Sequence, residues 1–246
     1  MLSFALGLGL LTALANILGS ALAVLQREPS RRFTAAALGL SGGFVLAAAL
    51  LEMVPESLTR GPAMPGFVAV GYLLVFLIEQ FTNVHLHSLP DDAHHVLVPV
   101  ATGLASLIAF IVHDLVDGLA IGAGMIANPE LGILIFLAVL LHEIPAGFVI
   151  AAIMRGSGWS RWAAMAAGGS LGLVTLIGIV LPFWIRQLDP YFADVLLALA
   201  AGSFIYVGAT LLVPLSEAGK SRWITLLVVL GFVIFYVSSH LVENFL

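Results

Sequence analysis

Two clusters of ionisable residues lie in the middle of long apolar runs of this chain. The stretch FIVHDLVDGLAIGAGM (residues 110–125) contains the first, and LLHEIPAGFVI (residues 140–150) contains the second. A charge without a partner in the centre of a membrane helix costs at least about 2.5 to 3.5 kcal/mol. Such side chains therefore indicate a function. The clusters consist of His113, Asp114 and Asp117, and of His142 and Glu143.

Helical spacing brings the first cluster to one side of a helix. His113 and Asp117 are four residues apart and share a face, and Asp114 flanks Asp117. In the second cluster, Pro145 cannot donate a hydrogen bond to the carbonyl oxygen of Leu141. We therefore expect a kink there, with that oxygen left free beside the cluster.

Small residues follow the first cluster and allow close packing. Gly118 and Gly122 form a GxxxG step, which lets a second helix approach to backbone distance. We expect the helix of the second cluster to be that partner, because only a short loop joins the two. The two histidines and three carboxylates would then meet near the bilayer midplane.

Imidazole and carboxylate donors together suit Zn²⁺, Fe²⁺, Mn²⁺, Co²⁺ or Ni²⁺. Carboxylates would offset the charge of the dication, and the dication would offset theirs. The chain has no cysteine, so thiolate ligands and disulfides are excluded and Cu(I) is disfavoured.

Two other classes of function compete with metal transport. Chains of Asp, Glu and His also serve proton-coupled transporters and antiporters, and the residues alone do not exclude this. An intramembrane metal-dependent enzyme is the second alternative. HisGluIleProAla begins like the zinc motif HExxH, but Ala146 stands where the second zinc histidine is required. We therefore rank an enzyme below transport.

The composition is that of an integral membrane protein rather than a soluble domain. The chain has 246 residues, of which 61% are hydrophobic and 9% charged, and a mean hydropathy of +1.13. Apolar runs long enough to cross a membrane as helices predict an all-α, polytopic fold in one transmembrane domain, residues 1–246. The eight predicted helices cover residues 2–25, 33–55, 65–84, 96–127, 131–154, 162–185, 193–215 and 223–245.

Basic residues between these helices predict the orientation, because Lys and Arg favour the cytoplasmic side. With both termini outside, the outer loops hold only Arg60 and Arg186. The inner loops then hold the other seven basic residues, which are Arg27, Arg31, Arg32, Arg155, Arg161, Lys220 and Arg222. The chain is therefore expected to be N-out and C-out, in the plasma (inner) membrane.

Further candidate residues lie on either side of the central clusters. Glu52, just before Pro55 near the outer end of the second helix, is either an interfacial charge or a ligand at the entrance of a pathway. The inner loop, residues 85–95, contains four histidines and two aspartates without Lys or Arg, and it could capture cations weakly. Those histidines are His85, His87, His94 and His95.

The second and seventh helices share a spacing that suggests an inverted repeat. Gly43 precedes Pro55 by the same number of positions that separate Gly202 from Pro214, and both prolines follow a valine. These helices would run in opposite directions, as in many secondary transporters. We expect helices one to three and six to eight to be the repeats, around helices four and five.

The two clusters resemble the motifs of the ZIP family, the Zrt-like and Irt-like divalent metal transporters. The family carries patterns such as H-N-x-x-D-G and H-E-x-P-H-E in its fourth and fifth helices. Here HisAspLeuValAspGly begins at His113 and HisGluIleProAlaGly begins at His142. Eight helices, external termini and the His-bearing loop extend the resemblance over the chain, as a divergent prokaryotic-type member.

The resemblance implies the roles of the site residues. His113, Asp117 and His142 would be primary ligands, and Glu52 would contribute from the second helix. Asp114 and Glu143 match positions that hold a second or transient metal. Ala146 replaces a usual ligand, so a single site, or a weaker second site completed by water, is expected. The family also implies an elevator-type movement of helices one, four, five and six, and a homodimer.

The predicted function is thus a secondary transporter that moves a divalent transition metal toward the cytoplasm. Zn²⁺ is the favoured substrate, and the ligands also accept Fe²⁺, Mn²⁺ and Cd²⁺. We expect no prosthetic group and no nucleic-acid partner. The expected partners are the metal ion and the lipid bilayer.

Overall fold

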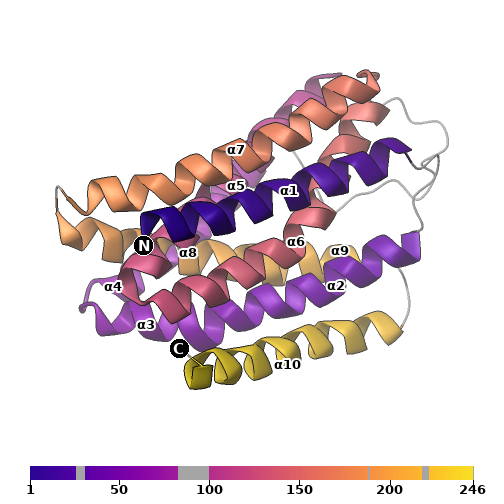
Figure 1. Cartoon of the computed structure of the whole chain (residues 1–246). Helices are drawn as coiled ribbons and strands as arrows, with labels where there is room; N and C mark the ends of the chain where they lie inside the picture. The colour runs from indigo at the N-terminus through magenta and orange to yellow at the C-terminus, as the bar shows by residue number, and fades with distance from the viewer. Residues whose placement is uncertain (26–30, 83–99, 188, 218–221, 246) are drawn as a thin grey trace.

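A computed structural model describes residues 1–25, 31–82, 100–187, 189–217 and 222–245, and every regular element in these ranges is helical. The helices lie roughly side by side in one bundle, with α7 and α10 at opposite edges of the view (Figure 1). The inner loop, residues 85–95, with His85, His87, His94 and His95, lies outside the described residues.

The observed helices follow the predicted ones closely. Two predicted helices, residues 33–55 and 193–215, are each built as an α-helix, one π-helical turn and a short α-helix. The bounds are α1 Leu2–Leu25; α2 Arg31–Ala48, η1 Ala49–Met53 and α3 Val54–Thr59; α4 Met64–Thr82; α5 Val100–Ala127; α6 Pro129–Gly156; α7 Arg161–Ile185; α8 Pro190–Tyr206, η2 Val207–Leu212 and α9 Val213–Glu217; and α10 Arg222–Phe245.

Both π-helical turns lie just before a proline. Pro55 follows η1 and Pro214 follows η2. A proline has no N–H to donate to the preceding turn, so the backbone there changes its hydrogen-bond register. The two composite helices therefore share one local distortion at matching places.

Seven segments of the described chain are long and apolar enough to cross a membrane, and Met64–Gln80 of α4 is a shorter apolar helix. Large apolar side chains such as Leu18 on α1 and Val229 on α10 are exposed on the protein surface. That is the surface a helical bundle presents to lipid tails. The protein is an integral membrane protein.

Glycines bring four pairs of helices to backbone contact. In each pair, a Cβ atom on either glycine would lie 1.9–2.5 Å from a carbonyl oxygen of the other helix, so only glycine fits. The pairs are Gly19 with Gly147 (α1 and α6), Gly118 with Gly178 (α5 and α7), Gly43 with Gly231 (α2 and α10), and Gly71 with Gly202 (α4 and α8).

One packing expectation is corrected. The GxxxG step of α5 does not face α6, because Gly118 and Gly122 lie against the backbone carbonyls of Thr175 and Ile179 on α7. Helix α6 instead packs against α5 at the next glycine, where Gly124 lies against Gly132. A turn of only a few residues places two helices side by side but does not decide their rotation, so α7 occupies the glycine face.

Candidate metal site

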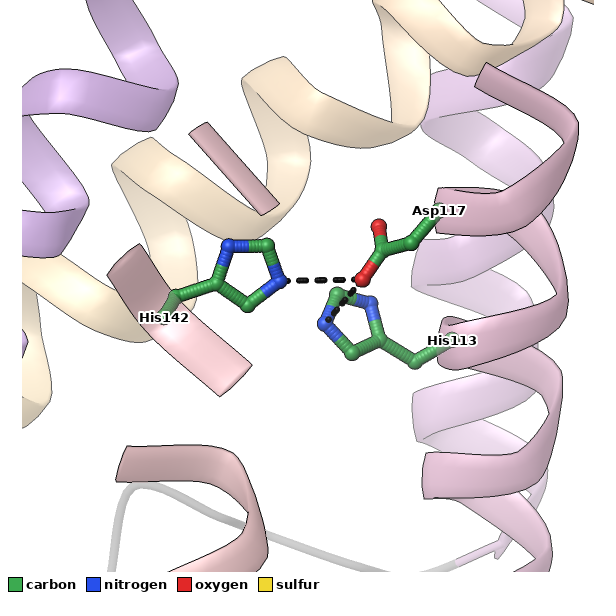
Figure 2. A group of neighbouring side chains, drawn as sticks. All are labelled: His113, Asp117 and His142. Carbon is green, nitrogen blue, oxygen red and sulfur yellow. Dashed lines mark hydrogen bonds and ion pairs between the residues drawn. The ribbon is translucent and has the colours of Figure 1, made fainter. Parts of the chain in front are cut away.

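His113, Asp117 and His142 converge at one buried point between α5 and α6. His113 and Asp117 are one turn apart on α5, and His142 points at them from α6 (Figure 2). One ligand atom from each of the three lies within 4.8 Å of the others. This is the only group of three potential metal ligands found among the described residues.

The oxygen Oδ2 of Asp117 is shared by the two imidazole rings. It lies 2.9 Å from Nε2 of His142 and 3.4 Å from Nε2 of His113. The Asp117 side chain is fully buried and that of His142 is 1% exposed, whereas His113 is 16% exposed. The site therefore has a buried anionic centre and one side that is more open.

The backbone of α6 orients the ring of His142. Its Nδ1 lies 2.9 Å from the carbonyl oxygen of Ala138. A carbonyl oxygen only accepts hydrogen bonds, so Nδ1 carries the hydrogen and donates it. The other nitrogen, Nε2, then faces Asp117 and is the atom available to a metal, an arrangement common among metal-binding histidines.

The contact between His142 and Asp117 requires a positive charge between its two atoms. Nδ1 of His142 bears a hydrogen, so a neutral His142 presents only a lone pair from Nε2 to the carboxylate. At 2.9 Å the two lone pairs repel unless a proton or a metal ion lies between them. The same two atoms can therefore hold either a proton or a cation.

Asp114 and Glu143 form a second buried polar group beside the first. Both are fully buried, and neither belongs to the three-residue cluster. Oδ2 of Asp114 accepts a hydrogen bond of 3.0 Å from Nδ2 of Asn16 on α1. Asp114 Oδ1 and both carboxyl oxygens of Glu143 have no hydrogen-bond partner among the described residues.

The carbonyl oxygen of Leu141 is not free, contrary to the expectation from Pro145. The hydroxyl of Ser41 on α2 donates a hydrogen bond of 2.9 Å to it. Helix α6 also continues through the proline as one element, Pro129–Gly156. The lost helical hydrogen bond is thus replaced by one from a neighbouring helix.

Glu52 does not belong to the three-residue cluster. It is in η1, half-buried, and accepts a hydrogen bond from the hydroxyl of Ser239 on α10. Its role as a ligand stays a prediction.

Sequence reasoning missed Asn16 and Ser41. The amide of Asn16 on α1 reaches Asp114 across 98 positions of sequence. A fully buried asparagine in an apolar helix is itself a signal, because its amide needs a partner. Ser41 carried no comparable signal, since serine is common in such helices.

Comparison with known proteins finds a matching family model and several related zinc transporters. The model of the family described as ZIP Zinc transporter matches residues 92–239. The zinc transporter ZupT of Corynebacterium aurimucosum is 28% identical over 237 residues, covering 88% of both chains. ZupT of Escherichia coli O7:K1 is 29% identical over 228 residues, again with 88% of both chains. The zinc transporter zipt-7.2 of Caenorhabditis elegans is 35% identical over 118 residues, which cover 46% of this chain and 25% of the worm protein.

Proposed function

The chain belongs to the ZIP zinc transporter family, and we propose that it moves Zn²⁺ toward the cytoplasm through the site of His113, Asp117 and His142. It is an integral membrane protein of the plasma membrane and a transporter of divalent metal rather than an enzyme. The direction, the choice of Zn²⁺ and the ligands are the proposal.

One observation carries this proposal, namely the shared position of Asp117 between two imidazoles. Two neutral nitrogen donors and one anionic oxygen are a donor set that Zn²⁺ favours. Their atoms lie within 4.8 Å of one another, so small side-chain movements would bring all three to bonding distance. Three protein ligands also leave coordination positions open, which a transported ion needs in order to leave.

We further propose an elevator-type movement of α1, α5, α6 and α7 against α2, α4, α8 and α10. The glycine contacts support this division, because α1 with α6 and α5 with α7 pack within one group, and α2 with α10 and α4 with α8 pack within the other. Single hydrogen bonds cross between the groups. Ser41 donates to the carbonyl of Leu141, and Arg60 donates to the carbonyl of Ala127 at 3.0 Å.

An inverted repeat with both termini outside is part of the proposed architecture of this single domain. The same number of positions separates Gly19 from Gly178 and Gly43 from Gly202. Another common spacing relates His113 to His142, Asp114 to Glu143, and Gly118 to Gly147. Under this relation Ala146 corresponds to Asp117, so only one of the two halves supplies the central carboxylate. That asymmetry supports a single metal site that contains both histidines, rather than two separate metal sites.

The remaining predicted residues have supporting roles in this scheme. We propose that Asp114 and Glu143 hold the ion transiently beside the main site, since both present buried oxygens without partners. Glu52 would attract the ion on the outer side. The histidines of the inner loop would receive it after transport.

We also propose that metal and proton movements are linked, because the contact between Nε2 of His142 and Asp117 can hold a proton when no metal is bound. Each Zn²⁺ that binds would displace this proton. The proton would then return when the ion leaves. This adds proton exchange to metal transport and does not require a different substrate.

Uptake of radioactive zinc into sealed liposomes that contain the purified protein tests the proposal. We expect uptake by wild type and its loss in His142→Ala. His240→Ala is the matched control, because His240 lies on α10 beside Tyr236, with ring centroids 4.4 Å apart, away from the cluster. Normal uptake by His142→Ala, or none by wild type, would refute the assignment.

A further inference from the structure

Asn16 presents a buried amide oxygen that the protein itself leaves without a partner. The side chain is fully buried on α1. Its Nδ2 donates to Asp114, but its Oδ1 has no hydrogen-bond partner among the described residues. Leaving a buried polar atom unsatisfied is unfavourable, so the free lone pairs of this oxygen are available to an electropositive ligand.

The same is true of the two carboxyl groups around it. Asp114 Oδ1 and both oxygens of Glu143 also lack partners, and all three atoms are shielded from solvent. Glu143 lies one helical turn before Gly147, where α6 touches the backbone of Asn16, and Gly19 of α1 touches the carbonyl oxygen of Ile144, the residue after Glu143. Four oxygen atoms from α1, α5 and α6 thus share one buried environment.

Close backbone contact holds Asn16 in this place. A Cβ on Gly147 would lie 2.2 Å from the backbone oxygen of Asn16, so α1 and α6 touch beside the site. One turn farther along α1, the hydroxyl of Ser20 donates to the carbonyl of Gly147 at 3.0 Å. Both contacts restrict rotation of α1 and keep the amide directed at Asp114.

We propose that Asn16 is a selectivity-determining ligand, whose Oδ1 binds the transported ion when the ion lies between Asp114 and Glu143. This inference rests on the proposed function and adds a residue of α1 to it. The position offers oxygen donors only, which suit harder cations such as Mn²⁺, whereas the imidazoles of the neighbouring site suit Zn²⁺. Acceptance of Mn²⁺ is thus governed by Asn16.

Binding of Mn²⁺ to the purified full-length protein, followed by electron paramagnetic resonance, tests this directly. Asn16→Leu keeps the approximate volume and removes the oxygen. We expect it to weaken Mn²⁺ binding at least about tenfold, the loss typical when a metal site loses a supporting group. Zn²⁺ affinity should change by less than about threefold, which corresponds to about 0.7 kcal/mol. His142→Ala should show the reverse pattern.

Two further variants distinguish a ligand role of Asn16 from a purely structural role. Thr12→Val is the matched control, since Thr12 is buried one turn earlier on α1 and donates to the carbonyl of Gly9 in its own helix. It should leave both affinities unchanged. Asn16→Asp keeps an oxygen but lacks the amide donor, and it should still bind Mn²⁺.

Each result of these binding measurements either supports or overturns the proposal. Weak Mn²⁺ binding in both Asn16→Leu and Asn16→Asp would show that the amide only positions Asp114, which overturns the proposal. Absence of Mn²⁺ binding in wild type, or unchanged binding in Asn16→Leu, would overturn it as well. If Asn16→Leu does not fold, Asn16→Ala takes its place: weaker Mn²⁺ binding supports the proposal, and unchanged Mn²⁺ binding overturns it. Zinc uptake that depends on His142 would stand in each case, so failure of this inference and failure of the proposed function are distinguishable.

Discussion

The hydroxyl of Ser41 on α2 donates a hydrogen bond of 2.9 Å to the carbonyl oxygen of Leu141 on α6. That carbonyl lacks its helical partner because Pro145 follows four positions later. A side chain of one proposed helix group thus satisfies a backbone atom of the other. The bond exists only while α6 is in this position relative to α2.

Ser41→Ala should shift the balance between conformations. An unsatisfied carbonyl costs about 1–3 kcal/mol, which corresponds to a shift of about 5- to 150-fold in the conformational equilibrium. The chain has no cysteine, so Ala37→Cys, in the cavity of about 170 Å³ between α1, α2 and α6, can be labelled selectively with a maleimide. We expect a changed labelling rate in the Ser41→Ala background.

Ser203→Ala is the control for that measurement. Ser203 is equally buried but donates to the carbonyl of Ala200 within its own helix, at 2.8 Å. Its replacement should leave labelling unchanged. Equal rates in all three proteins would mean that the Ser41 bond does not distinguish conformations.

Zinc binding should release about one proton, because the ion would replace the proton that we propose lies between Nε2 of His142 and Asp117 when no metal is bound. Lower pH favours the proton-bound state, so apparent affinity should fall up to about tenfold per pH unit while that proton is bound. Calorimetry in two buffers with different ionisation enthalpies measures the number released. Asp117→Asn should release about one proton fewer, since an amide can donate to Nε2 directly. An identical proton count in the variant would contradict this origin.

Asp117→Asn should also reduce zinc affinity more than His113→Ala does. Asp117 is the only carboxylate of the cluster and is fully buried, so its loss removes the negative charge nearest to the dication in a medium of low dielectric. His113 is 16% exposed, and water can replace its nitrogen. We expect a loss of at least about 100-fold for Asp117→Asn. Titration with Zn²⁺ measures the affinity of both variants. A larger loss of affinity in His113→Ala than in Asp117→Asn would contradict this prediction.

Gly147→Ala should separate α1 from α6. The added methyl group would meet the backbone oxygen of Asn16 at 2.2 Å, and a backbone atom cannot move aside as a flexible side chain can. Overpacking of this kind costs about 1–3 kcal/mol. Thermal unfolding in detergent should show a lower midpoint than for wild type. Gly7→Ala on α1, where no atom lies within 4 Å of the new carbon, should leave the midpoint unchanged. Equal midpoints for Gly147→Ala and wild type would mean that the contact between Gly147 and Asn16 is not tight.

Much of the fold followed from local patterns. The predicted helix at residues 2–25 coincides with α1, and the predicted end at residue 127 is that of α5. Hydropathy sets the length of such helices, and Pro, Gly and Asn mark their ends. The π-helical turns before Pro55 and Pro214 were not predicted, because a change of register depends on the neighbours that accept the displaced backbone groups.

The order of residues is enough to predict the donor types of the site and their positions along each helix. His113 and Asp117 share a face because the helical repeat places residues four apart on one side, whatever surrounds them. Which oxygens have partners depends instead on how the helices pack. Asn16 and Ser41 meet Asp114 and Leu141 across long separations in sequence. Such contacts depend on the rotation and close approach of helices, which backbone contact at Gly147 and Gly118 sets and which no local pattern encodes.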